Sequence, residues 1–265
     1  MQDRARHIMW ALLNLLGFAA TLVLNALANI LPLNGKQTGE LSDSYPNLFV
    51  PAGLTFSIWG VIYLLLTAFI VYQLVCVVRG SRDRGFLDRI GPLFLISSVA
   101  NSLWIVAWHW QLVPLSLLLM LVLLGSLIAM YLRLEIGRGD KERARKLLVE
   151  LPFSVYLGWI TVATIANTTA LLVDAGWGGL GLSEVFWAVL VIIAALVITA
   201  LMLYTRGDVA YALVVLWALL GIYLKRTAVA LPTDDGVELA ALLGVLLVGV
   251  GIVARKVGPL LRSTA

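Results

Sequence analysis

Long apolar segments separated by short polar ones dominate the pattern along the chain. A helix needs about 17–25 mainly apolar residues to cross the hydrocarbon of a bilayer, and eight segments meet this requirement. They cover residues 8–31, 51–78, 90–110, 112–132, 151–173, 184–205, 208–224 and 237–254. The pattern predicts an all-α integral membrane protein with about eight transmembrane helices. Only Arg206-Gly207 separates the sixth and seventh segments, which therefore form either two full spans or a re-entrant hairpin.

Composition supports the membrane prediction. Of the 265 residues, 61% are hydrophobic and 13% are charged, whereas soluble domains average about 45–50% apolar and about 25% charged residues. This balance excludes an ordinary soluble domain.

The basic residues indicate how the spans are oriented, because cytoplasmic loops hold Lys and Arg in excess. With both termini cytoplasmic, the inner segments take 16 of the 19 basic residues and the outer loops keep only Lys36, Lys225 and Arg226. An even number of spans with cytoplasmic ends follows. The net charge of +4 then reflects topology, since basic loops face anionic lipid, and nucleic acid is not an expected partner.

The first apolar segment has a second interpretation as a signal peptide, with Ala26-Leu27-Ala28 as the cleavage site. Its apolar stretch exceeds the usual h-region, and Asn14, Asn25 and Asn29 lie within it. These features favour a transmembrane helix that remains part of the protein.

Ionisable side chains are missing from the span interiors, where they usually mark ion or proton pathways. Glu184 and Asp208 stand at helix starts, where a carboxylate favours the helix dipole and Ser183 can cap. His109 is expected at the outer interface as part of an aromatic belt. The sequence also lacks HExxH, CxxC, GxSxG and phosphate-binding glycine motifs. No catalytic residue and no metal ligand is assigned.

Aromatic rings and uncharged amides instead form stripes at helical spacing on three spans. The stripes are Phe56, Trp59, Gly60 and Tyr63 on the second span, Asn101, Trp104 and Trp108 on the third, and Tyr156, Trp159, Ala163 and Asn167 on the fifth. With a rise of about 1.5 Å per residue, Trp59 lies roughly 12 Å below the outer surface, and the other stripes reach a similar height. We expect the stripes to meet around a pocket in the outer half of the membrane.

A buried indole N–H or amide without a partner costs about 1–3 kcal/mol, so either the stripes satisfy one another or a ligand does. Interhelical hydrogen bonds that join helices are the simpler alternative for any single residue. The long outer loop of residues 32–50, with its turn-forming Asn34-Gly35, is expected to act as a lid.

Three segments resemble the signature regions of a known family, the tryptophan-rich sensory proteins, also called translocator proteins or TspO/MBR. The segments are "PAGLTFSIWGVIY", "NSLWIVAWHW" and "YLGWITVATIANTTALL". The resemblance covers about residues 10–175, and Trp59, Tyr63, Asn101, Trp104, Trp159, Ala163 and Asn167 fall on the family's positions. The spacing from Phe56 to Trp59 and the place of Pro152 depart from the family pattern.

The resemblance implies a five-helix bundle whose long first loop covers a ligand pocket, and it implies binding of a porphyrin or haem. The ligand-binding residues are then expected to be Phe56, Trp59, Tyr63, Asn101, Trp104, Trp108, Tyr156, Trp159, Ala163 and Asn167. No cofactor is required. The leading hypothesis is a non-enzymatic binding or sensory protein of the bacterial inner membrane for a planar hydrophobic ligand. A small-molecule transporter and a porphyrin-degrading enzyme are the alternatives.

The last three spans fall outside the five-helix pattern, which predicts two units, residues 1–175 and 176–265. They follow the glycine-rich "DAGWGGLGLS" and are expected to dock on the five-helix bundle. The expected partners are the lipid bilayer and a hydrophobic small molecule, with a homodimer as an open alternative.

Overall fold

The fold is described from a computed structural model that covers residues 2–31, 33–228 and 235–262. Pro32 of the predicted lid, and residues 229–234 and 263–265 of the predicted C-terminal unit, lie outside the described residues. So do the side chains of residues 2, 82, 83 and 258–262.

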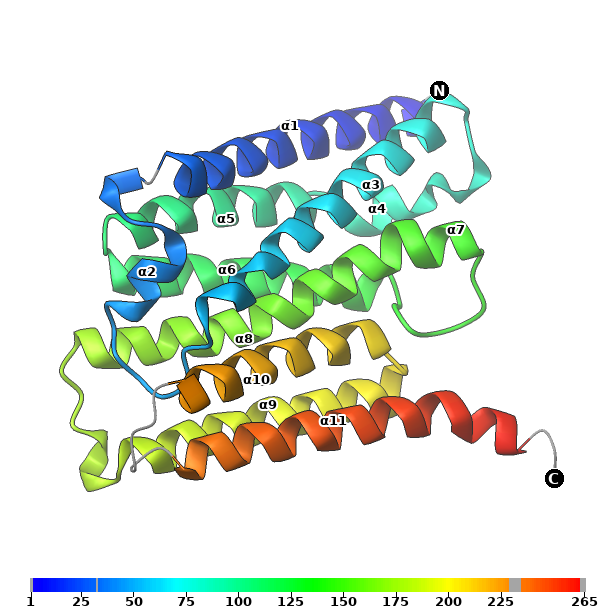
Figure 1. Cartoon of the computed structure of the whole chain (residues 1–265). Coiled ribbons are helices and arrows are strands. Elements are labelled where there is room, and N and C mark those ends of the chain that lie inside the picture. The colour runs from blue at the N-terminus through cyan, green and yellow to red at the C-terminus, as the bar shows by residue number, and fades with distance from the viewer. Residues whose placement is uncertain (1, 32, 229–234, 263–265) are drawn as a thin grey trace.

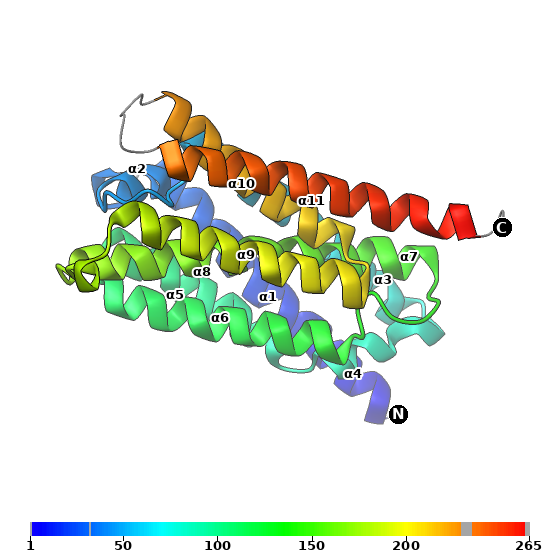
Figure 2. The ribbon, with the colours of Figure 1, turned by 90° about the horizontal axis from the view of Figure 1, so that it is seen from below.

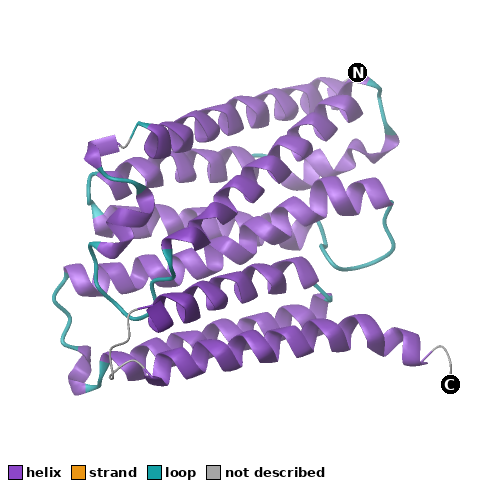
Figure 3. Ribbon diagram, in the orientation of Figure 1, coloured by secondary structure: helices purple, strands orange, loops and turns teal. Residues whose placement is uncertain are grey.

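Helices account for nearly all of the regular structure, and the described residues contain no strand (Figure 3). The long helices are α1 (Gln2–Ile30), α3 (Ile58–Val78), α5 (Leu93–His109), α6 (Val113–Arg133), α8 (Leu151–Asp174), α9 (Glu184–Arg206), α10 (Val209–Ala228) and α11 (Asp235–Arg262). Short helices are α2 (Thr38–Asp43), α4 (Phe86–Ile90) and α7 (Arg143–Arg145). The predicted all-α membrane fold is confirmed.

Seven helical stretches in the described part of the chain are long and apolar enough to cross a membrane. The remaining predicted span, α5, has 17 residues and so lies at the lower end of the required range of about 17–25. Both α9 and α10 are among the seven. Each is therefore long enough to be a full span, and a re-entrant hairpin is not needed to explain their lengths.

Local sequence signals explain several helix ends. Ser183 caps α9 as predicted, because its side chain accepts a hydrogen bond from the backbone N–H of Phe186 at 3.2 Å. Gly207 ends the same helix with φ 63°, a conformation that suits glycine. The second span begins differently from the prediction: a 3-10 turn, Gly53–Ser57, follows Pro51, and α-helical geometry starts only at Ile58.

The first five long helices close a ring. Around it, α1 packs on α3 and α5, α5 on α6, α6 on α8, and α8 on α3 (Figure 1). The other three form a layer outside the ring, in which α10 packs on α8 and on both α9 and α11 (Figure 2). The last three spans therefore dock on the ring, as expected, and α10 and α8 supply most of the contact.

Polar residues of α1 face the interior of the ring. Asn14 donates to the side chain of Gln73 at 3.1 Å, and Thr21 bonds the backbone oxygen of Ser98 at 3.1 Å. The side chains of Asn14, Thr21 and Gln73 are all buried. Helix α1 therefore completes the ring, and its polar groups are satisfied by its neighbours.

The docking of α10 depends on a close approach at Gly221. The backbone N–H of Ala52 donates to the Gly221 oxygen at 3.0 Å, and the Trp217 indole donates to the Thr55 oxygen at 3.0 Å. A Cβ on Gly221 would lie only 1.9 Å from Thr55 Oγ1. Ala52, a small residue next to Pro51, admits this close approach of the α10 backbone. A Cβ added to Gly53 would meet no other atom within 4 Å.

Asp208, at the other end of α10, does more than the predicted capping. One carboxylate oxygen accepts from the backbone N–H of Tyr211 at 3.0 Å, which is the expected N-terminal cap. The other accepts from the hydroxyls of Tyr131 at 2.8 Å and Ser154 at 2.7 Å. Asp208 is buried and therefore links α10 to α6 and α8.

Candidate functional site

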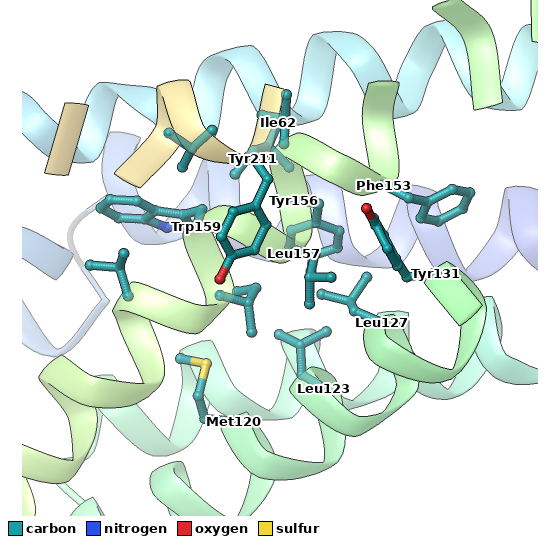
Figure 4. Packing of buried hydrophobic residues seen from close by; sticks show 14 of the residues in the cluster. Ile62, Met120, Leu123, Leu127, Tyr131, Phe153, Tyr156, Leu157, Trp159 and Tyr211 are labelled. Atoms are coloured by element: carbon teal, nitrogen blue, oxygen red, sulfur yellow. The ribbon is translucent and has the colours of Figure 1, made fainter. Parts of the chain in front are cut away.

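The three predicted stripes meet inside the ring in one aromatic cluster, formed by Phe56, Trp59, Tyr63, Trp104, Trp108, Tyr156 and Trp159. Trp59 lies at its centre. The Trp59 ring is 5.6 Å from Tyr63, 5.9 Å from Trp104, and 6.2 Å from both Tyr156 and Trp159, measured between centroids. Figure 4 shows Tyr156 and Trp159 of α8 among the buried core residues. Stripes on α3, α5 and α8 therefore converge as the helical spacing predicts.

Asn101 has its hydrogen bonds satisfied within the protein. Its side-chain oxygen accepts from Asn25 at 2.8 Å, and its amide donates to the Tyr156 hydroxyl at 2.9 Å. All three residues are buried. This arrangement is the helix-joining alternative considered for a single amide, and neither Asn101 nor Tyr156 lines a cavity described below.

Asn167 is likewise satisfied by side chains of neighbouring helices. Its side-chain oxygen accepts from the Trp104 indole at 3.0 Å, and its amide donates to Ser116 at 2.9 Å. These bonds connect α8 to α5 and α6. Ser116 was not singled out from the sequence, because a lone serine in an apolar span carries no distinctive spacing.

The lid folds over the cluster. The Trp108 indole donates to the Thr38 backbone oxygen at 3.4 Å, and Asn34 donates to the His109 backbone oxygen at 2.9 Å. Asn34 and Gly35 both have positive φ, 54° and 79°, as their turn prediction requires. Burial raises the pKa of Tyr45, another lid residue, and the Asp174 carboxylate raises it further. Tyr45 is therefore a neutral phenol that packs against Trp108.

His109 lies elsewhere than predicted. It is fully buried, with Nδ1 at 2.8 Å from the Ile105 oxygen, and so is not part of a lipid-facing belt. Trp110 is the residue exposed at that end of α5. The helical period explains the difference, because His109 and Trp110 necessarily point to different faces.

Two buried donors in the cluster lack a protein partner. The Trp159 indole nitrogen and the Tyr63 hydroxyl make no hydrogen bond with any described residue. Each such group costs about 1–3 kcal/mol when it is buried unpaired. A ligand with acceptor atoms would remove this cost.

Two cavities border the cluster. The first, which we call the hollow, has a volume of about 40 Å³ and is lined by residues that include Trp104, Trp159, Ala163 and Asn167. The second, which we call the cleft, has a volume of about 590 Å³ and lies between α1, the lid and α3. Small-molecule sites are usually about 300–1,000 Å³, so only the cleft can take a molecule of that class without rearrangement.

Trp59 lines both cavities, as do Phe56 and Thr38. Of the predicted site residues, Phe56, Trp59 and Tyr63 line the cleft, whereas Phe56, Trp59, Trp104, Trp108, Trp159, Ala163 and Asn167 line the hollow. The cleft adds Asn25, Asn29 and Gln37, which the site prediction did not include. The asparagines were visible in the first span, but their spacing alone did not connect them to α3.

Comparisons with known proteins give one match. The family model described as TSPO-like protein matches residues 11–254. The match extends from α1 into α11 and so passes the boundary predicted at residue 175. No curated protein and no solved structure matches the chain.

Proposed function

Since the chain belongs to the TSPO-like family, an all-α family of membrane proteins, we propose that it binds a planar hydrophobic ligand of the porphyrin type in the cleft beside Trp59. Membership supports a sensory or binding protein of the membrane in general. The choice of ligand is the proposal, and it depends on the shape and chemistry of the cleft.

The flat wall of the cleft is the observation that carries the proposal. The Trp59 and Tyr63 rings are stacked, with 19° between their planes and 5.6 Å between their centroids. Both residues line the cleft, and the buried Tyr63 hydroxyl has no hydrogen-bond partner among the described residues. A planar conjugated ligand would continue this stack of rings and would accept a hydrogen bond from the phenol once a small rotation of the Tyr63 side chain uncovers its hydroxyl.

The opposite side of the cleft is polar. Asn25 and Asn29 of α1 and Gln37 of the lid contribute amide groups there, and Glu40 and Asp43 of α2 contribute carboxylates, of which Asp43 pairs with Lys225. These groups suit the polar edge of an amphipathic ligand. Because the lid forms one wall, its displacement would open the cleft toward the end of the bundle that carries α2. The ligand would thus enter from the outer side predicted by the distribution of basic residues.

Replacing Tyr63 by phenylalanine tests the proposal. The hydroxyl has no protein partner among the described residues, so its loss should leave the melting temperature unchanged or higher while it weakens protoporphyrin binding about fivefold to tenfold, the value of one hydrogen bond. Trp59→Leu should weaken binding at least as much through lost ring contact. Quenching of tryptophan fluorescence during titration of the purified protein measures both affinities.

Trp110→Leu is the matched control, because Trp110 is exposed and lines neither cavity. The affinity of Trp110→Leu for protoporphyrin should stay within about twofold of the wild-type value. Equal affinity in the wild type, Tyr63→Phe and Trp59→Leu would exclude the cleft as the site. Loss of porphyrin absorbance with a defined product would identify the enzyme alternative, and movement across vesicles would identify the transporter.

We also propose that both termini face the cytoplasm of a bacterial cell. The N-terminus of α1 and the C-terminus of α11 lie at the same end of the bundle (Figure 1), and most basic residues fall in the segments at this end. A green fluorescent protein fused to the C-terminus should fluoresce, and alkaline phosphatase fused there should be inactive. An active phosphatase fusion would reverse the proposed orientation.

A further inference from the structure

A third cavity, also at the lid end of the bundle, is separate from the cleft and the hollow. It has a volume of about 460 Å³ and lies between the end of the lid, the C-terminus of α8 and the N-terminus of α9. It shares no lining residue with the cleft or the hollow. Figures 1 and 2 show the connection from α8 to α9 at the same end of the molecule as α2. Its size is that of a small-molecule site.

Two tryptophans form a fixed aromatic wall in this cavity. The Trp177 and Trp187 rings meet edge to face, with 4.9 Å between their centroids and 62° between their planes. The Trp187 indole donates to the Gly179 oxygen at 2.9 Å, which holds its ring in place. Phe49 and Leu172 extend the apolar lining. Tryptophan faces attract cations more strongly than other aromatic rings.

Glu184 gives the cavity its charge. It is the only ionisable side chain in the lining, which contains no Lys, Arg or His. Glu184 is exposed and makes no hydrogen bond or ion pair with the residues that the structure describes. A helix N-terminus by itself favours anions, but Ser183 already caps α9 and the Glu184 carboxylate opposes a second negative charge.

We propose that this cavity binds a monovalent organic cation, an ammonium attached to an apolar or aromatic body. The ammonium lies against the Trp177 and Trp187 rings within reach of Glu184, and the apolar body lies against Phe49 and Leu172. Aromatic cages recognise quaternary ammonium groups through the ring faces, and a carboxylate nearby adds a favourable charge interaction. The same chemistry is offered by a soluble cation and by the choline headgroup of a lipid, because tryptophans of this kind lie at the membrane interface.

Isothermal titration of the purified protein in maltoside detergent with benzyltrimethylammonium tests the proposal. The wild type should bind this cation and should not bind its neutral carbon isostere, neopentylbenzene, with comparable affinity. Glu184→Gln should weaken cation binding roughly tenfold, and Trp187→Leu at least as much. Glu184→Asp, which keeps the charge, should restore most of the affinity. Melting temperatures show that each variant is folded.

Asp174→Asn is the matched control, since it removes a carboxylate from the same end of α8 without altering the cavity lining. It should bind the cation within about twofold of wild type, and so should Tyr63→Phe, whose hydroxyl belongs to the cleft. Doping the micelles with dodecylphosphocholine assigns the source: competition identifies the choline headgroup, and its absence identifies a soluble cation. Unchanged affinity in Glu184→Gln, or equal binding of the neutral isostere, would overturn the proposal.

Discussion

Replacing Gly221 by alanine is expected to lower the free energy of unfolding by about 1–3 kcal/mol, the usual cost of overpacking. The new Cβ would lie 1.9 Å from Thr55 Oγ1 and 2.9 Å from both Thr55 Cβ and Cγ2. Neither backbone can retreat freely, because Ala52 bonds the Gly221 oxygen and Trp217 bonds the Thr55 oxygen. Thermal denaturation of the purified variant and wild type in the same detergent measures the loss.

Gly125→Ala on α6 provides the control. Nothing lies within 4 Å of the Cβ position of Gly125, so alanine there should leave stability unchanged or raise it by up to about 1 kcal/mol through helix propensity. The double variant Gly221→Ala with Thr55→Ala should recover part of the loss, because it removes Oγ1 and Cγ2. A Gly221→Ala protein as stable as wild type would show that α10 does not approach the 3-10 turn this closely.

The same contact connects the three C-terminal helices to the proposed ligand site. Thr55 and Phe56 are neighbours in the 3-10 turn, and Phe56 lines both the cleft and the hollow. Its ring also meets Trp159 edge to face at 5.9 Å between centroids. Because α10 fixes this turn, loss of the contact should loosen the start of α3 and with it the wall of the cleft. The C-terminal layer therefore supports the geometry of the site.

Helical periodicity was sufficient to predict which residues of the site share a face. Trp104 and Asn167 stand on stripes of different spans, and their hydrogen bond follows because both stripes face the interior at a similar height. Periodicity could not predict which partner satisfies an amide. Asn101 bonds Asn25 and Tyr156, so it joins helices within the protein. The position of the larger cavity on the α1 side of Trp59 depends on side-chain packing, which leaves no pattern in the sequence.

Contacts between segments far apart in the chain could not be predicted from the sequence either. Gly221 is one of 23 glycines, and only its distance from Thr55, 166 positions earlier in the chain, distinguishes it. Asp208 illustrates the same limit. Its place at a helix start correctly predicted a cap, but its bonds to Tyr131 and Ser154 depend on how three helices pack.

Removing the Asp208 carboxylate should have the other large effect. In Asp208→Ala the buried hydroxyls of Tyr131 and Ser154 and the backbone N–H of Tyr211 all lose their acceptor. Unsatisfied buried donors and a lost cap together should lower the free energy of unfolding by about 3 kcal/mol. Thermal denaturation in detergent measures this loss. Asp140→Ala is the control: its side chain is fully exposed, and stability should change by no more than about 0.5 kcal/mol.

The asparagine variant separates the two roles of Asp208. Asparagine caps helices about as well as aspartate, so Asp208→Asn would be as stable as wild type if capping of α10 were the whole function. In the structure the second carboxylate oxygen accepts from two hydroxyls, whereas an amide nitrogen at that position is a donor. At least one hydroxyl must then turn and accept instead. We therefore expect Asp208→Asn to fall between wild type and Asp208→Ala, and wild-type stability would contradict the link between α10, α6 and α8.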